Sequence, residues 1–136
     1  MMTDIKKLKT SLIQIIIFVI SLALFTNCSK QNNLINNLTV EYSSTPLGID
    51  VKNPRFGWQM HAPENARGFY QTAYQIIIKD PSGELIWDSK KVNSGSALAI
   101  KYDGPTLQAS TKYNWTVTVW DQKNQEHAAS TWFENG

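Results

Sequence analysis

The chain has 136 residues, of which 42% are hydrophobic and 18% are charged, a composition typical of one globular domain with its own core. Its formal net charge is only +2. Residues 1–27 contain three of the 13 basic residues and one of the 11 acidic residues, so residues 28–136 hold ten of each. A domain with balanced charge has no basic stripe, which argues against nucleic acid as a partner.

The first 27 residues have the layout of a cleavable secretory signal peptide. Three lysines form a basic start, and an apolar run follows from residue 12 to residue 25. Gln14 and Ser21 interrupt that run, which is also too short to be a comfortable membrane span. The sequence therefore predicts secretion across the inner membrane, with an uncleaved anchor helix as the alternative.

Cys28 is the only cysteine of the chain and comes soon after the apolar run. It cannot close a disulfide within the chain, and the alternative of a buried small hydrophobe fits poorly with the polar stretch that follows. The surrounding residues "LFTNCS" resemble a bacterial lipoprotein signal, in which the cysteine becomes the first mature residue and is acylated. The resemblance implies a lipid anchor on Cys28 that holds the protein at a bacterial membrane, expected to be the outer membrane. Residues 28–37 are polar and are expected to be a tether.

Residues 38–136 contain short alternating runs with the period of a β-strand, separated by turn-forming residues. No amphipathic helix of convincing length interrupts them. Strands are predicted at residues 38–42, 55–60, 71–79, 84–89, 97–102, 112–121 and 130–134. Seven strands in about a hundred residues are typical of an all-β sandwich of the immunoglobulin or fibronectin type III kind.

The strand at 112–121 carries the clearest fold signal. Leu107 and Tyr113 lie six residues apart around its start, a spacing that resembles the tyrosine corner of such sandwiches. In that corner the tyrosine hydroxyl bonds back to the preceding turn, whereas the alternative is an ordinary core tyrosine. In the same strand every second residue is apolar, which predicts that one face packs on the core. That face consists of Tyr113, Trp115, Val117 and Val119.

Trp120 breaks this alternation, because it falls on the face where polar residues are expected. If the last two strands pair, Phe133 faces the core and Trp132 joins Trp120 on the outer face, where Ile77 also points. Three apolar side chains on one outer face favour a partner that covers them. The hypotheses are a further domain of the same protein, a platform that stacks on sugar rings, and a partly exposed pair of tryptophans without a partner.

The sequence contains no recognisable catalytic or metal-binding group. His61 and His127 stand apart from each other and are expected in solvated turns. There is neither a glycine-rich phosphate loop nor a nucleophile elbow. The few carboxylates lie mainly in turns, whereas glycoside hydrolysis needs two that face one sugar site. No catalytic residue, cofactor or metal is therefore predicted.

Four runs in order resemble the N-terminal segment of bacterial alpha-L-rhamnosidases. They are "EYSSTPLGIDVKNPRFGWQM", "QTAYQIIIKD", "LIWDSKKVNSG" and "YNWTVTVWDQKNQEHAASTWFENG". The resemblance covers residues 38–136 and implies an accessory sandwich of the fibronectin type III kind. In that family, further β-domains and a helical catalytic barrel follow, and the acidic catalytic residues lie in the barrel.

The resemblance implies a function for the chain as a whole. It would be the non-catalytic N-terminal module of a secreted, lipid-anchored rhamnosidase, inactive alone, with the downstream domains of the enzyme and a rhamnose-containing glycan as its partners. Two alternatives are a stand-alone surface lipoprotein that binds carbohydrate or mediates adhesion, and a purely structural spacer.

Overall fold

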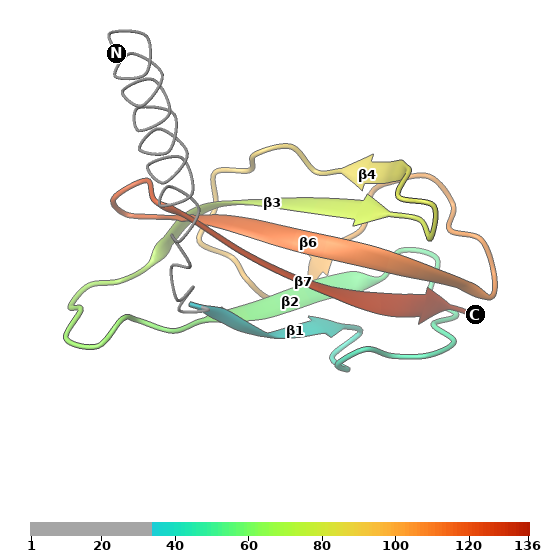
Figure 1. The fold of residues 1–136 in the computed structure, drawn as a ribbon, viewed down its shortest axis with the longest axis horizontal. Coiled ribbons are helices and arrows are strands. Elements are labelled where there is room, and N and C mark those ends of the chain that lie inside the picture. Colours follow the sequence, from blue (N-terminus) through green and yellow to red (C-terminus); the bar gives the residue numbers. More distant parts are fainter. Residues whose placement is uncertain (1–33) are drawn as a thin grey trace, which may run out of the picture. The chain divides into compact units, whose positions relative to one another are not determined.

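A computed structural model describes residues 34–136 as two β-sheets packed face to face (Figure 1). The expected signal peptide, Cys28 and the first part of the expected tether lie outside these described residues. Within residues 34–136, no helix is long and apolar enough to span a membrane.

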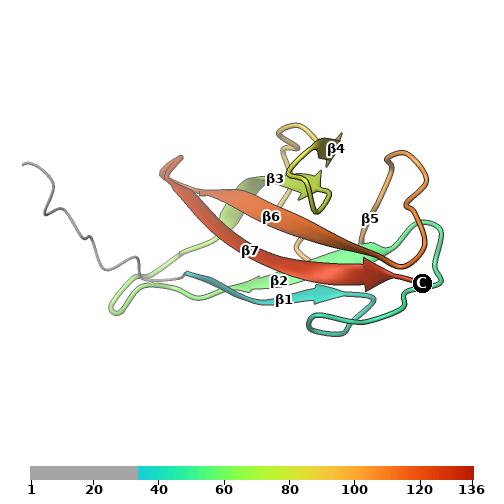
Figure 2. The same cartoon turned by 45° about the vertical axis from the view of Figure 1, so that its right-hand side comes forward.

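The seven strands divide into a sheet of three and a sheet of four, which Figure 2 shows as separate layers. The first sheet has the order β1-β2-β5, with β1 (Ile35–Val40), β2 (Arg55–Met60) and β5 (Ile100–Lys101). The second has the order β4-β3-β6-β7, with β4 (Leu85–Asp88), β3 (Gln71–Lys79), β6 (Thr111–Asp121) and β7 (Glu126–Asn135). All neighbouring strands are antiparallel. The predicted seven-stranded all-β sandwich is confirmed.

Three strands differ from their predicted bounds by more than one residue at an end. β1 begins at Ile35, inside the segment expected to be a tether, and Ile35 is only 2% exposed. β5 is reduced to two residues, and β7 begins at Glu126 rather than at residue 130. The asparagines of β1 and the polar first residues of β7 do not show the apolar alternation of a strand, so the sequence pattern misses where these two strands begin. Backbone pairing extends a strand beyond its apolar residues.

The core is a cluster of aromatic rings held between the two sheets. The Phe56 ring centroid lies 4.8 Å from that of Trp115, 5.8 Å from that of Phe133 and 6.5 Å from that of Trp87. The first two pairs are tilted and edge-on and the third is stacked, and such aromatic pairs stabilise a core beyond the area that they bury. The residues of β6 predicted to face inward are buried, as is Phe133, and this part of the prediction is confirmed.

The predicted tyrosine corner is also confirmed. The backbone N–H of Gln108 donates a 2.9 Å hydrogen bond to the hydroxyl oxygen of Tyr113, and Leu107 is buried beside it. A second tyrosine, Tyr102, donates its hydroxyl to the carbonyl of Pro105 at 2.6 Å. The segment that leads from β5 to β6 is therefore fixed by two tyrosine side chains.

The two ends of the sandwich hold different parts of the chain (Figure 1). At one end, Ile35 at the start of β1 pairs with Met60, and the hairpin between β6 and β7 turns. At the other end, β7 finishes and the chain reaches Gly136. The start of β1 and the end of β7 thus lie at opposite ends of the domain.

Candidate functional site

Trp120 points away from the core but is covered by its own chain. Its neighbour Val119 is buried in the core, so the Trp120 ring lies on the outer face of the four-stranded sheet. The indole N–H donates to Glu126 Oε1 at 3.0 Å, and Lys91 Nζ lies 4.0 Å from the ring centroid. Trp120 is only 7% exposed. The ring therefore does not lie open for another domain or for a sugar.

The position of Lys91 depends on a contact between segments distant in the sequence. Val92 forms an antiparallel bridge with Tyr74 through two backbone hydrogen bonds of 2.9 and 2.8 Å. This bridge extends the sheet past the end of β4 and brings the preceding Lys91 to Trp120. A lysine over an indole ring is an attractive cation–π pair.

Trp132 and Ile77 share the outer face with Trp120 but do not form one patch with it. Trp132 pairs with Asn114, whereas Trp120 lies six positions further along the same strand, at about 3.3 Å per residue and so about 20 Å away. Trp132 and Ile77 are half-buried, and Lys112 Nζ lies 4.0 Å from the Trp132 ring centroid. The expected shared platform is thus divided into separate positions.

His127 lies within β7 and not in the solvated turn expected for it. Its Nε2 lies 3.1 Å from Oδ2 of Asp121, and the Phe69 ring stands edge-on at a centroid distance of 5.9 Å. His61, in contrast, is exposed just after β2. Within residues 34–136, no three His, Cys, Asp or Glu side chains are placed to hold a metal ion.

Asp121 is a buried carboxylate that closes the hairpin between β6 and β7. Its Oδ1 accepts the backbone N–H groups of Lys123 at 2.8 Å and Gln125 at 2.9 Å. Burial by itself would raise the pKa of Asp121, but the hydrogen bonds from Gln125, His127 and Lys123 outweigh it and hold the pKa below its ordinary value. The group is a charged anchor of the turn.

Asp88 has a similar structural role at the end of β4. Its Oδ1 accepts the Gln75 amide and the Lys90 backbone N–H, both at 2.8 Å, and its Oδ2 lies 2.9 Å from Lys90 Nζ. The Gln75 hydrogen bond and then the Lys90 ammonium lower the pKa of Asp88. This carboxylate, like that of Asp121, is bound by groups of its own domain.

Gln71, like Asp121, is a buried polar group whose burial the sequence did not reveal. Its Oε1 accepts the indole N–H of Trp58 at 2.9 Å, and its amide nitrogen donates to the carbonyls of Ser94 and Ser96 at 2.9 and 2.8 Å. One amide thus links β2, β3 and the loop before β5. An alternating strand pattern gives no sign of it, because Gln71 reads as an ordinary polar strand residue.

The end of β7 binds the segment that follows β1, and the two runs "PLGID" and "FENG" meet there. Ile49 N–H donates to the Glu134 carbonyl at 3.0 Å, and Gly136 N–H donates to the Ile49 carbonyl at 2.9 Å. Glu134 N–H in turn donates to the Pro46 carbonyl at 3.0 Å. Segment 46–49 therefore forms a short parallel addition to the edge of β7.

Gly136 approaches this segment too closely for a larger residue. A Cβ atom on Gly136 would lie 2.5 Å from Oδ1 of Asp50 and 3.1 Å from the backbone of Gly48. Only glycine fits this position without a shift of its neighbours. The course of the chain at the end of the domain is fixed by contact as well as by hydrogen bonds.

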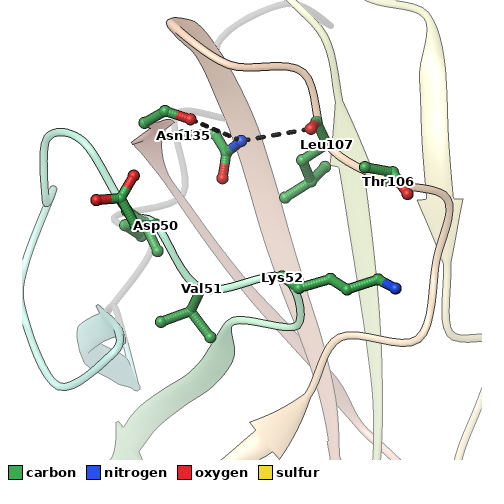
Figure 3. A pocket seen from close by; sticks show the side chains of 8 residues that line it. Asp50, Val51, Lys52, Thr106, Leu107 and Asn135 are labelled. Carbon is green, nitrogen blue, oxygen red and sulfur yellow. Dashed lines mark hydrogen bonds between the residues drawn. The ribbon is translucent and has the colours of Figure 1, made fainter.

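A small cavity of about 100 Å³ opens beside this contact (Figure 3). Asn135 Nδ2 donates to the carbonyls of Leu107 and Gly136, both at 3.4 Å, along one side of the cavity. Its full lining is Ile49, Asp50, Val51, Lys52, Thr106, Leu107, Asn135 and Gly136.

A second and larger hollow of about 610 Å³ lies next to the first and shares Thr106 with it. Its apolar wall contains Pro81, Leu85 and Pro105, and its polar groups include Asp80. Glu84 lines the hollow as well, and Oδ1 of Asp80 accepts the Ser82 hydroxyl at 2.6 Å and the backbone N–H groups of Ser82 and Glu84 at 2.8 and 2.9 Å. Both hollows lie at the end of the sandwich where β7 finishes.

A family model matches residues 35–136, and its description is "Rha78A-like, N-terminal immunoglobulin domain". Two curated relatives are named alpha-L-rhamnosidase. The protein of Streptomyces avermitilis is 37% identical over 108 residues, which cover 75% of this chain and 10% of that protein. A protein of Formosa agariphila is 32% identical over 139 residues, which cover 94% of this chain and 13% of that protein.

Solved structures of the same kind share the fold. The crystal structure of Streptomyces avermitilis alpha-L-rhamnosidase complexed with L-rhamnose gives a TM-score of 0.69 at 36% identity, over 75% of this chain and 10% of that chain. The alpha-L-rhamnosidase from Dictyoglumus thermophilum gives 0.68 at 35% identity, over 79% and 13%. This chain therefore spans only about a tenth of the length of the relatives that it matches. The match along residues 35–136 shows that the chain belongs to the family of Rha78A-like N-terminal immunoglobulin domains.

Proposed function

We propose that this chain is the non-catalytic N-terminal module of a secreted, lipid-anchored alpha-L-rhamnosidase, whose downstream domains hydrolyse terminal alpha-L-rhamnose. The observation that carries the proposal is the match of residues 35–136 to an N-terminal domain family whose relatives are named alpha-L-rhamnosidase. These relatives are much longer than the matched region, so the remainder of the enzyme would follow Gly136.

The state of the carboxylates supports an accessory role for the domain. Glycoside hydrolysis uses a protonated acid and a second carboxylate that face each other across the scissile bond. Asp88 and Asp121 are each held by three hydrogen bonds or ion pairs within the domain, and both have lowered pKa values. Neither is suited to donate a proton to a leaving group near neutral pH.

The geometry of the outer face argues against the alternative of a stand-alone sugar-binding lipoprotein. A stacking platform needs an open aromatic face, whereas lysines cover the rings of Trp120 and Trp132 at two separate positions. We therefore keep the accessory module as the proposed function.

The DNA that follows codon 136 tests the proposal directly. We expect an open reading frame that continues into a catalytic domain, and a stop codon at this point in the native gene would contradict the accessory role. As a second test, purified residues 28–136 are expected not to hydrolyse an aryl rhamnoside. Turnover that disappears on changing Asp88 or Asp121 would contradict the proposal.

Lipid anchoring is tested at Cys28. The Formosa agariphila match covers more of the chain than residues 35–136 provide, so it reaches into the N-terminal segment. We expect Cys28→Ser to block acylation and to move the protein from the membrane fraction to the soluble fraction, because the acyl chains would be the remaining anchor after cleavage. Unchanged membrane retention, with the N-terminal segment still attached, would instead support an uncleaved anchor helix.

A further inference from the structure

Exposed apolar side chains gather at the end of the sandwich where β7 finishes. Leu47 is 70% exposed and Val51 is 44% exposed, and they lie on either side of the Gly48–Asp50 backbone that receives Gly136. Leu85 is 54% exposed at the start of β4 and lines the larger hollow. Single exposed leucines are ordinary, but a group of them around one point of a small domain indicates a contact surface.

Thr106 joins Val51 and Leu85 in one continuous surface, and Leu47 lies two positions before Ile49, which lines the smaller hollow. Val51 and Thr106 line the smaller hollow, and Thr106 and Leu85 line the larger one. We name the surface formed by Leu47, Val51, Thr106 and Leu85 the exit surface. Polar groups surround it, including Asp50, Lys52, Glu84 and Gln108. Interfaces between domains of one chain have this mixed character and are more polar than permanent subunit interfaces.

We propose that the next domain of the same rhamnosidase polypeptide packs on the exit surface. This inference rests on the proposed function, because it requires that the enzyme continues beyond residue 136. The backbone of Gly136 is fixed to Ile49 in the middle of the exit surface, so any following domain is tethered beside it. A short tether gives a high effective concentration, which allows even a modest surface to stay occupied.

Two further features favour this surface over the rest of the domain. The tryptophans of the outer face are already covered by Lys91 and Lys112, as described above. The start of β1 at Ile35 lies at the opposite end of the sandwich. The exit surface is the part of the described domain that combines exposed apolar side chains with the outgoing chain.

The experiment uses the longer protein encoded by the continuous reading frame, with one cysteine introduced at a time. Residues 34–136 contain no cysteine, so Leu47→Cys places a single thiol on the exit surface. Leu98→Cys is a matched control, because Leu98 is 67% exposed, packs beside Gly57 of β2 and lines neither hollow. The alkylation rate of each thiol by iodoacetamide is measured by mass spectrometry of the peptide that contains it.

We expect Leu47→Cys to react about tenfold more slowly than Leu98→Cys. A surface that is covered for about nine-tenths of the time leaves the thiol accessible for about one-tenth of it, and the apparent alkylation rate falls to that tenth. Val51→Cys should be slowed in the same way. Equal rates at positions 47 and 98 in the longer protein would overturn the docking proposal while leaving the accessory role intact. A reading frame that stops at residue 136 would instead contradict the accessory role itself, so the two failures are distinguishable.

Discussion

Trp58 donates its indole N–H to Oε1 of Gln71 over 2.9 Å, inside the sandwich and between its two sheets. The other end of the Gln71 amide binds the carbonyls of Ser94 and Ser96. Both sheets and the loop before β5 therefore depend on one buried amide.

Gln71→Met should lower the free energy of unfolding by roughly 1–3 kcal/mol, because it removes three hydrogen bonds and leaves the buried indole N–H of Trp58 without a partner. Gln59→Met is the matched control at an exposed position of β2 and should change stability by less than about 0.5 kcal/mol. Urea titration of both variants and the parent measures the difference. Equal midpoints for the two variants would contradict the role given to Gln71.

Trp120→Thr is expected to cost about 3 kcal/mol, a value near the lower end for truncation of a buried tryptophan. Its ring is 7% exposed, and the change also leaves Glu126 and Lys91 without their contacts. Trp132→Thr, at a half-buried position, should cost about 1 kcal/mol by loss of a partly covered ring and one cation–π contact. Guanidinium titration of the two single variants tests the order, and a larger loss for Trp132→Thr would show that the order is wrong.

Asp121 is expected to make the free energy of unfolding depend on pH in the acid range. Its pKa in the folded protein lies below the ordinary value of 3.8, so its contribution is complete above that pH and is lost as the pH falls through the native pKa. Asp121→Asn keeps an oxygen for Lys123 and Gln125 but loses the carboxylate charge beside His127. We therefore expect the variant to be less stable than the parent at about pH 5 and the difference to shrink as the pH falls toward about 3. Thermal unfolding between these two values measures it, and a difference that grows over this range would contradict the assignment.

Tyr102 is expected to make the free energy of unfolding depend on pH in the alkaline range. Burial, together with the nearby Tyr113, raises the pKa of Tyr102 from 10.0 to about 12. A raised pKa means that the contribution of the neutral phenol is complete below pH 10 and is lost as the pH rises through about 12. Tyr102→Phe removes the 2.6 Å hydrogen bond to the Pro105 carbonyl. In an absorbance titration of the tyrosines, it should also remove the ionisation step that occurs at the highest pH, near 12. If this step persists in the variant, it belongs to another tyrosine.

The sequence by itself determined the class of fold and the family. The bounds of β2 and β3 follow from alternation at residues 55–60 and 71–79, because the side chains of a strand alternate locally between two faces. The spacing of Leu107 and Tyr113 indicated a tyrosine corner, and the structure confirms it through the hydrogen bond between Gln108 N–H and the Tyr113 hydroxyl oxygen. Order and spacing of the four runs were enough to indicate the rhamnosidase family, which the match along residues 35–136 shows.

Only the tertiary structure decided what covers Trp120 and which residues meet at the end of the domain. Period two says that Trp120 leaves the core, but its cover is Lys91, which the bridge between Val92 and Tyr74 brings to the ring. In the same way, Gly136 meets Ile49 through a pairing of distant segments. A strand pattern records the face of each residue and nothing of its partner across the fold. The long-range pairing therefore decides that the Trp120 ring is covered by its own chain.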